Sequence, residues 1–270
     1  MMKKSLRFLL GFLTCMLIAV AACPHAEAGS GVTLSAYTAT PPTLDGNIQA
    51  AEWAAAASKT FGPFGPGMAY SGTLYMMNDG TNLYIGVSIE GDATFSAGDG
   101  FSVYFDNDHG AEATWELGDD YVGAWGASSF GDLFFDGGSF VSDVPGGTID
   151  GQAAGSRQGS SNQFELSHPL NDADDAHDIS LSLGQTVGFS FMPQVDGTSY
   201  SVIPDFGNVA IPSTYANYVV ASPPPTPTPT PVGGVLVPVN KLVLLSPYLA
   251  LLGLVGAVTV AVVVQRRRKN

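Results

Sequence analysis

The residues best suited to chemistry in this chain are carboxylates that follow a short apolar strand pattern. Phe101, Val103 and Phe105 alternate with Ser102 and Tyr104, which is the pattern of a strand with one buried face. A cluster of acids follows at one edge of the expected fold: Asp106, Asp108, Glu112, Glu116, Asp119 and Asp120. Clustered oxygen ligands suit a hard cation, calcium above all. The predicted calcium ligands are Asp106, Asp108, Glu116, Asp119 and Asp120, and the alternative is a solvated acidic turn.

The spacing of these acids predicts an irregular metal site. Asp106 and Asp108, two positions apart, can both reach one ion, but no EF-hand pattern of glycine and glutamate follows them. A second acidic segment spans residues 171–178, with acids at Asp172, Asp174, Asp175 and Asp178. We interpret this second segment as a solvated loop in preference to a metal site.

Aromatic side chains lie close to the first acidic cluster and predict a ligand surface. Trp115, Tyr121 and Trp125 are close in sequence, with Asp119 and Asp120 between them. Flat apolar rings stack on sugars while carboxylates bond their hydroxyl groups. We therefore predict that these three aromatic residues bind carbohydrate; the alternative is that one or two of them fill the core.

The sequence gives less support to catalysis, zinc binding or haem binding. The chain has no Gly-x-Ser-x-Gly nucleophile motif, and acids are so frequent that carboxylate pairs arise by chance, so an enzyme is not predicted. His109 and His177 lack the closed set of partners that zinc requires, so we interpret them as inert. Axial haem ligands are available in Met76, Met77, His109 and His168, but we interpret the methionines as core residues, because one of two neighbouring strand residues must face inward.

The charge of the chain excludes one class of partner. Residues 29–221 hold 23 of the 24 acids but only two of the ten lysines and arginines, Lys59 and Arg157. Phosphate binding needs basic residues, so a nucleic-acid partner is excluded. The two cysteines, Cys15 and Cys23, lie before this region, which therefore has no disulfide. Bound cations are a hypothetical substitute for those cross-links.

The first 28 residues have the features of an export signal. Basic residues near the start precede an apolar run from Phe8 to Ala22 and a region of small residues. Two processing routes fit: cleavage after Ala28, which we favour, or lipidation of Cys23 at a lipobox-like sequence.

The last part of the chain predicts a membrane anchor on a spacer. Residues 222–241 begin with a Pro/Thr repeat, which is typical of an extended stalk, with or without glycosylation. Residues 242–264 carry no charge over the length of a spanning helix. The basic residues of 265–270 place that tail in the cytoplasm and the preceding domain outside the plasma membrane, at the cell surface.

The region between these ends, residues 29–221, predicts one all-β domain. Alternating or apolar strand patterns recur with turns between them at 32–37, 72–77, 83–89, 101–105, 121–125, 132–135, 163–167, 186–191 and 218–220. An alanine-rich stretch, 48–57, predicts one short helix that Trp53 anchors to the core, and 61–68 predicts a Gly/Pro-rich loop. An edge strand is expected within 146–161. The fold class is therefore an antiparallel two-sheet β-sandwich with one short helix.

Several of these segments together resemble family-nine carbohydrate-binding modules and the wider DOMON-like group of extracellular sandwiches. The resemblance runs from about Leu44 to Val220 and is carried in order by Leu44-Asp45-Gly46, Glu52-Trp53, Leu74-Tyr75, Asn78-Asp79, Leu83-Tyr84-Ile85, Phe101 to Asp106, Phe164-Glu165-Leu166, Pro169-Leu170 and Gly184 to Phe189. It implies a two-sheet sandwich with calcium-braced loops, and either sugar held between aromatic rings or haem. No pair of tryptophans aligns with the family's sugar clamp residue by residue.

The expected function is a non-catalytic, cell-surface carbohydrate-binding module stabilised by calcium, with a polysaccharide or glycan as its partner. Two alternatives stay open at this point. One is a haem-binding redox module of the same sandwich type, and the other is a calcium-stabilised adhesion or envelope domain without a sugar ligand.

Overall fold

A computed structural model describes residues 29–110, 112–144, 146–171 and 177–224. The predicted signal peptide, most of the stalk and linker, the predicted membrane helix and the basic tail lie outside the described residues. Within the described ranges, no helix is both long enough and apolar enough to span a membrane.

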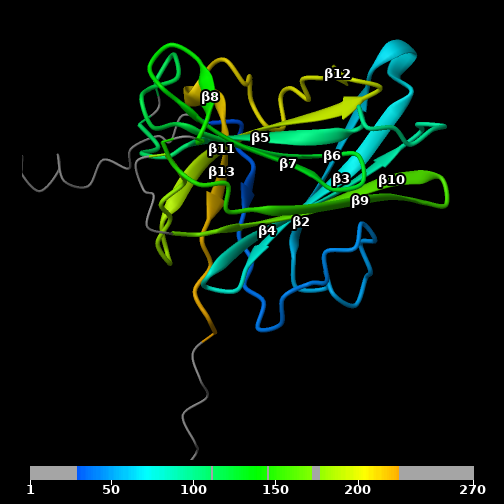
Figure 1. Cartoon of the computed structure of the whole chain (residues 1–270), viewed down its shortest axis with the longest axis horizontal. Coiled ribbons are helices and arrows are strands. Elements are labelled where there is room, and N and C mark those ends of the chain that lie inside the picture. The colour runs from blue at the N-terminus through cyan, green and yellow to red at the C-terminus, as the bar shows by residue number, and fades with distance from the viewer. Residues whose placement is uncertain (1–28, 111, 145, 172–176, 225–270) are drawn as a thin grey trace, which may run out of the picture. The chain divides into compact units, whose positions relative to one another are not determined.

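The described residues form an all-β structure of two stacked sheets (Figure 1). The larger sheet has eight strands in the order β1-β13-β11-β5-β6-β7-β8, with β12 paired to β11. Their bounds are β1 Thr33–Leu34, β5 Gly100–Asp106, β6 Asp120–Trp125, β7 Ser129–Phe135, β8 Phe140–Ser142, β11 Thr186–Val195, β12 Thr198–Ser199 and β13 Ala216–Val219. The smaller sheet has the order β2-β3-β4-β10-β9. Its strands are β2 Ala57–Phe64, β3 Tyr70–Asn78, β4 Asn82–Glu90, β9 Gln152–Gln158 and β10 Ser161–Pro169.

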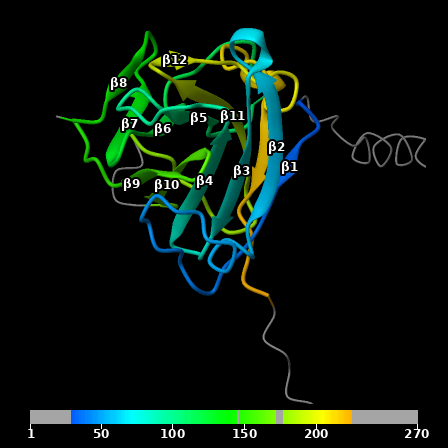
Figure 2. The same cartoon turned by 90° about the vertical axis from the view of Figure 1, so that its right-hand side faces the viewer.

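Both sheets are built from antiparallel pairs with one exception. The short β1 runs parallel to β13 at the edge of the larger sheet; Figure 2 shows the sandwich turned by 90° from the view of Figure 1. The hairpin of β3 and β4 turns at Gly80, whose φ of 90° is readily adopted only by a residue without a Cβ atom. Asp79 fixes this turn by accepting hydrogen bonds from the backbone of Thr81 and Asn82.

The main core lies between the sheets and consists of alternate residues from both. Phe101, Val103 and Phe105 of β5 are at most 1% exposed, as their alternation predicted. Phe164 and Leu166 of β10 meet them from the smaller sheet. The opposite faces of the same strands therefore point out of the sandwich.

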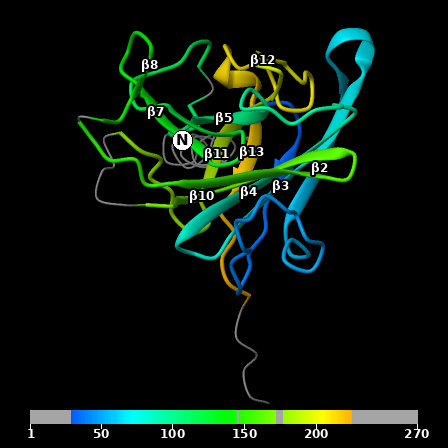
Figure 3. The ribbon, with the colours of Figure 1, turned by 45° about the vertical axis from the view of Figure 1, so that its right-hand side comes forward.

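The outer face of the smaller sheet is covered by the chain's own residues 36–56, the blue segment below β3 and β4 in Figure 3. Trp53 packs there on Met77 and Tyr84, and its indole N–H donates to Glu165 at 2.8 Å. The interpretation of Trp53 as a core anchor is thus confirmed. The larger sheet is therefore the one whose outer face can offer side chains to a ligand.

The predicted helix at 48–57 is wrong. This segment forms turns, held by short-range hydrogen bonds such as Ala56 N–H to Trp53 oxygen, and β2 starts at Ala57. A helix of about ten residues has little stability of its own, and here the fixed position of Trp53 decides the backbone. The only helical elements in the described residues are single 3₁₀ turns at Pro66–Met68 and Pro212–Thr214.

One further expectation about the strands needs correction. The segment at 61–68, expected to be a loop, forms the second half of edge strand β2 up to Phe64, with a register shift between Phe61 and Phe64. A proline is tolerated at such an irregular edge. The next strand along the chain, β5, lies in the other sheet, where it pairs with β6 and β11. The edge strand expected within 146–161 is confirmed as β9.

Candidate functional site

A row of aromatic side chains lies on the outer face of the larger sheet. Because Phe101, Val103 and Phe105 face the core, Tyr104 points outward from β5, and the same alternation turns Tyr121 and Trp125 outward from β6. Trp115, in the segment joining β5 and β6, stacks on Tyr104 with ring centroids 6.1 Å apart and planes 10° apart. We call this set, completed by Phe140 of β8, the aromatic row: Tyr104, Trp115, Tyr121, Trp125 and Phe140.

The structure thus brings together all three predicted ligand-binding residues. Trp125 is nearly parallel to Tyr121, at 6.1 Å between centroids, and Phe140 contacts both Tyr121 and Trp115. All five side chains of the row are partly buried and none is closed off from solvent. They form a continuous partly exposed apolar surface on a sheet.

Glycines in the strands determine how Trp125 lies. A Cβ atom on Gly123 would come within 2.4 Å of the Trp125 ring, and one on Gly131 within 2.6 Å. A Cβ atom on Gly100, which lies opposite Trp125 in the neighbouring strand, would be 2.7 Å from the edge of the same ring. The indole therefore lies against the backbone of three strands, in space that exists because these positions have no side chain.

Hydrogen bonds hold the rings of the row in place. The Trp125 indole N–H donates to Gln194 at 3.0 Å, and the Tyr121 hydroxyl shares a 2.8 Å hydrogen bond with Ser102. The Trp115 N–H donates to the Tyr215 hydroxyl at 3.0 Å. Tyrosine hydroxyl groups are neutral at physiological pH, and burial raises the pKa of Tyr104 and Tyr121 further still. A rigid and uncharged stacking surface results.

An acidic group lies at one end of the same sheet face. Asp106 follows Tyr104 on the outward side of β5, and its ligand oxygen lies within 4.8 Å of ligand oxygens of Asp108 and Glu112. Asp106 is 1% exposed, and neither of its carboxylate oxygens has a hydrogen-bond partner among the described residues. Burial, with the charges of Glu112 and Asp108, raises its pKa to about 6. These are oxygen donors that a hard cation would stabilise.

The other predicted metal ligands divide between this group and the remainder of the structure. Asp119 lies near it, since burial and the charge of Asp106 raise the Asp119 pKa to about 7. One Asp119 oxygen already accepts a hydrogen bond from the backbone of Glu116 at 2.9 Å. The side chain of Glu116 is exposed and is not part of the three-residue group.

Asp120 does not join the acidic group. It follows Asp119 directly, so strand alternation turns it to the opposite face, into the core, where it is 0% exposed. There it faces a second set of ionisable side chains, Asp132, His168 and Asp178, whose charges act on it. Burial, the dominant effect, raises the Asp120 pKa well above its usual range.

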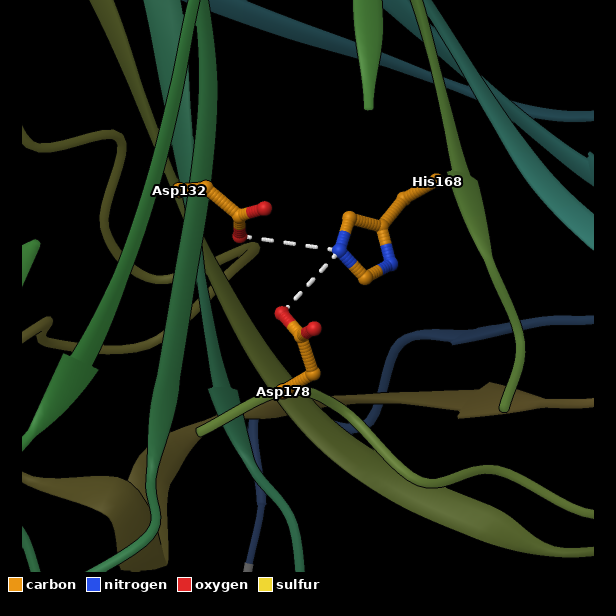
Figure 4. Close-up of side chains that lie close together, drawn as sticks. All are labelled: Asp132, His168 and Asp178. Carbon is orange, nitrogen blue, oxygen red and sulfur yellow. Dashed lines mark ion pairs between the residues drawn. The ribbon is translucent and has the colours of Figure 1, made fainter. Parts of the chain in front are cut away.

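This second set, the interior cluster, lies between the two sheets (Figure 4). His168 Nε2 is 3.5 Å from an Asp132 oxygen and 3.3 Å from an Asp178 oxygen, and all three side chains are at most 3% exposed. Burial lowers the His168 pKa, but the ion pairs with Asp132 and Asp178 outweigh it and raise it to about 11. Asp178 is therefore not a solvated loop residue, while Asp172, Asp174 and Asp175 lie outside the described residues.

Sequence reasoning missed several members of both sites. The strand pattern places Tyr104 on the polar side of β5 without indicating a ligand surface, and no motif in the sequence singles out Phe140 or Gln194. The glycines at 100, 123 and 131 were an available signal, because glycine inside a strand often marks close approach of another group. Asp132 and His168 share the inward phase of apolar residues in their strands, a second signal that strand periodicity contained.

Met76 and Met77, which were weighed as haem ligands or core residues, are both packed in the interior. Met76 is fully buried in the main core, and Met77 is fully buried against Trp53 and Tyr84 on the other side of the same strand. Their expected role in core packing is confirmed. His109, one of the three histidines of residues 29–221, lies beside Asp106 with a positive φ of 54°.

Comparison with known proteins identifies the fold. The sequence matches no protein-family model and no curated protein. Among solved structures, the chain is similar to a family-nine carbohydrate-binding module from Caldicellulosiruptor kristjanssonii in complex with glucose, at 13% identity and a TM-score of 0.50, over 72% of this chain and 100% of that one. A structure of a family-nine module from the same organism with cellotriose matches at 12% identity and a TM-score of 0.48, over 75% and 99%. The domain has a family-nine-like sandwich fold, as the sequence resemblance predicted.

Proposed function

We propose that this chain is a non-catalytic carbohydrate-binding module that holds glycans against the aromatic row. The carrying observation is Trp125, whose indole lies against the sheet over Gly100, Gly123 and Gly131 and is only partly buried. A sugar ring has apolar C–H faces that pack on such a ring, while its hydroxyl groups need polar neighbours. Gln194 and Ser102 supply amide and hydroxyl groups beside the rings.

Sugar complexes of proteins with this fold support the ligand class. The two solved family-nine modules contain glucose and cellotriose, which are properties of those proteins. Together with the aromatic row of this chain, the glucose-bound module favours a glycan built of hexoses as the first ligand to test. The site proposed here rests on the stacked rings of this chain and not on a residue-by-residue correspondence.

The proposal predicts that Trp125 carries much of the affinity. Isothermal titration of the full chain with glucose, cellotriose, xylotriose and chitotriose should identify a ligand, and Trp125→Ala should weaken its binding about tenfold or more. Tyr75→Ala is the matched control, because Tyr75 is a partly buried aromatic residue beside Trp53, on the outer face of the other sheet. Equal affinity of Trp125→Ala and the unmodified chain would reject the site.

Calcium is the second part of the proposal. The buried Asp106 with unpartnered oxygens, together with Asp108 and Glu112, supports a calcium ion that braces the segment between β5 and β6. That segment also carries Trp115, so calcium would stabilise one end of the aromatic row. Adding calcium to calcium-depleted protein should raise the melting temperature, and Asp106→Asn should remove the increase; an unchanged melting temperature would reject the calcium site.

Presentation at the cell surface completes the proposed function. The apolar run 242–264, the basic residues after it and the Pro/Thr repeat before it support a membrane-anchored domain on a stalk outside the cell. These residues, apart from the first three of the stalk, lie outside the described part of the chain. Protease added to intact cells should release the β-sandwich; protection of the domain from protease would contradict this topology.

A further inference from the structure

The residues of the interior cluster take no part in the proposed sugar and calcium sites. It joins both layers of the sandwich: Asp132 lies on β7 of the larger sheet, His168 lies on β10 of the smaller sheet, and Asp178 precedes β11. Asp120 of β6 faces the same place from the larger sheet. One imidazole and three carboxyl groups thus meet inside the protein, away from solvent.

The polar atoms of this cluster are poorly satisfied by the protein itself. Among the described residues, Asp120 Oδ2 and Asp178 Oδ2 have no hydrogen-bond partner, and both side chains are more than nine-tenths buried. His168 Nε2 faces two carboxylates but makes no hydrogen bond of good geometry with either. Buried carboxylates without partners are costly, which indicates that a positive group belongs among them.

The distances fit a shared cation better than a direct ion pair. A charged N–H···O hydrogen bond is about 2.7–2.9 Å long, whereas His168 Nε2 lies 3.3 and 3.5 Å from its two carboxylate oxygens. Ligand atoms arranged as a tetrahedron at about 2.0–2.1 Å from a zinc ion lie roughly 3.3–3.4 Å from one another. The oxygens of Asp132 and Asp178 also lie within 4.8 Å of each other.

The second ring nitrogen of His168 is oriented as in a metal ligand. His168 Nδ1 lies 2.7 Å from the backbone oxygen of Pro169, a distance at which Nδ1–H donates to that carbonyl. This contact fixes the ring and leaves the Nε2 lone pair of a neutral imidazole facing Asp132 and Asp178. Histidines that bind metals commonly make such a hydrogen bond with their other nitrogen.

We propose that the interior cluster is a structural site for a divalent transition metal, zinc in the first place, with His168 Nε2, Asp132 and Asp178 as ligands. A mixed imidazole and carboxylate set suits zinc, whereas calcium prefers six to eight oxygens at longer distances. The ion would replace the proton on His168 and offset the charge of the surrounding carboxylates. It would also link the two sheets in a described region that contains no cysteine.

Metal analysis of the full chain tests this site directly. Purified in detergent, loaded with zinc and dialysed, the chain should retain about one equivalent of zinc by mass spectrometry, and zinc should raise its melting temperature by about 5–10 °C. Cobalt in place of zinc should give the intense visible absorption of a tetrahedral site. His168→Gln and Asp178→Asn should lose the metal and the absorption, while Asp106→Asn, a buried acid of the other group, should keep both.

The wild-type readouts decide the question even if a variant fails to fold. Absence of stoichiometric zinc, with no change in melting temperature and no cobalt absorption, would overturn the proposal and leave a metal-free ion triad. A melting response to calcium alone that Asp106→Asn abolishes would place the only cation in the outer acidic group, which also overturns it. Loss of the zinc response with sugar binding intact would separate this site from the proposed carbohydrate function.

Discussion

Two tryptophans of this domain lie on strand glycines, yet they serve opposite purposes. Trp53 lies over Gly86 of the smaller sheet, is 3% exposed and donates its N–H to the buried Glu165. Trp125 lies over Gly123 and Gly131 of the larger sheet and remains partly exposed. The difference is the second layer: residues 36–56 cover Trp53, so of these two tryptophans Trp125 is the one with a ring face that a ligand can use.

The glycines under Trp125 should matter for binding as much as the ring itself. In Gly131→Ala, the new Cβ would lie 2.6 Å from the Trp125 ring, so the indole must move away from the sheet. We expect weaker glycan binding, by about threefold to tenfold, with a changed near-ultraviolet circular dichroism signal. Titration of the variant with the glycan identified for the wild type measures the effect.

The control for this substitution is Gly138→Ala in the turn between β7 and β8. A Cβ there would meet only an Asp136 oxygen, at an ordinary 3.5 Å, and the position does not require a positive φ. This variant should bind as the wild type does. Unaltered glycan binding by Gly131→Ala would show that the position of the Trp125 indole against the sheet does not matter for the ligand site.

At the scale of elements, the segment between β5 and β6 should respond to pH through its buried acids. Without calcium, the folded-state pKa of Asp106 is about 6 and that of Asp119 about 7, both above the ordinary value of 3.8. The folded state then holds these protons more tightly than the unfolded state, so its stability falls as the pH rises from about 4 through 7.

Calcium should reverse this trend, because it binds the deprotonated carboxylates. The increase in melting temperature on adding calcium should therefore grow between pH 5 and pH 8 in buffers freed of calcium over a chelating resin. Asp106→Asn should flatten the dependence. A calcium effect of equal size at pH 5 and pH 8 would contradict the assignment of these acids as ligands.

The covering segment, residues 36–56, should contribute to stability and not to binding. Trp53→Phe removes the hydrogen bond from the indole N–H to Glu165, a buried carboxylate that also accepts from the backbone of Asp45 and Gly46. We expect a loss of about 2 kcal/mol, equivalent to a decrease of about 4–8 °C in melting temperature. Glycan affinity should be unchanged.

Trp125→Phe provides the matched comparison, measured by the same calorimetric melt. Its N–H bonds only the partly exposed Gln194, so water can replace that partner and the stability loss should be smaller. Equal stability losses in the two variants would mean that Trp53 and Trp125 are not distinguished by burial as described.

At the scale of the whole molecule, strand periodicity predicted which residues face the core but not which strands pair. The alternation of 83–89, 101–105 and 163–167 located β4, β5 and β10 correctly. It did not show that the chain crosses to the other sheet between β4 and β5, because alternation describes faces and carries no information on neighbours. The helix at 48–57 was wrong because alanine content was given more weight than the contacts of one tryptophan.

The candidate sites were predictable to a similar extent. Trp115, Tyr121 and Trp125 do lie together. Tyr121 and Trp125 share one face of β6, and Trp115 packs on the same face through its contacts with Tyr104 and Phe140. Asp119 and Asp120 were expected in one metal site, although neighbouring strand residues point to opposite faces. Asp132, His168 and Asp178 come from three separate segments, so their meeting depends on the pairing of sheets and could not be inferred locally.

The central claim is that the aromatic row of the larger sheet is the carbohydrate site. The chain has three tryptophans, and so gives three indole N–H signals in a nitrogen–proton NMR spectrum of the tryptophan-labelled full chain. On titration with the bound oligosaccharide, the signals of Trp125 and Trp115 should shift while that of the covered Trp53 stays in place. A glycan that binds without shifting Trp125, or that shifts only Trp53, would contradict the account.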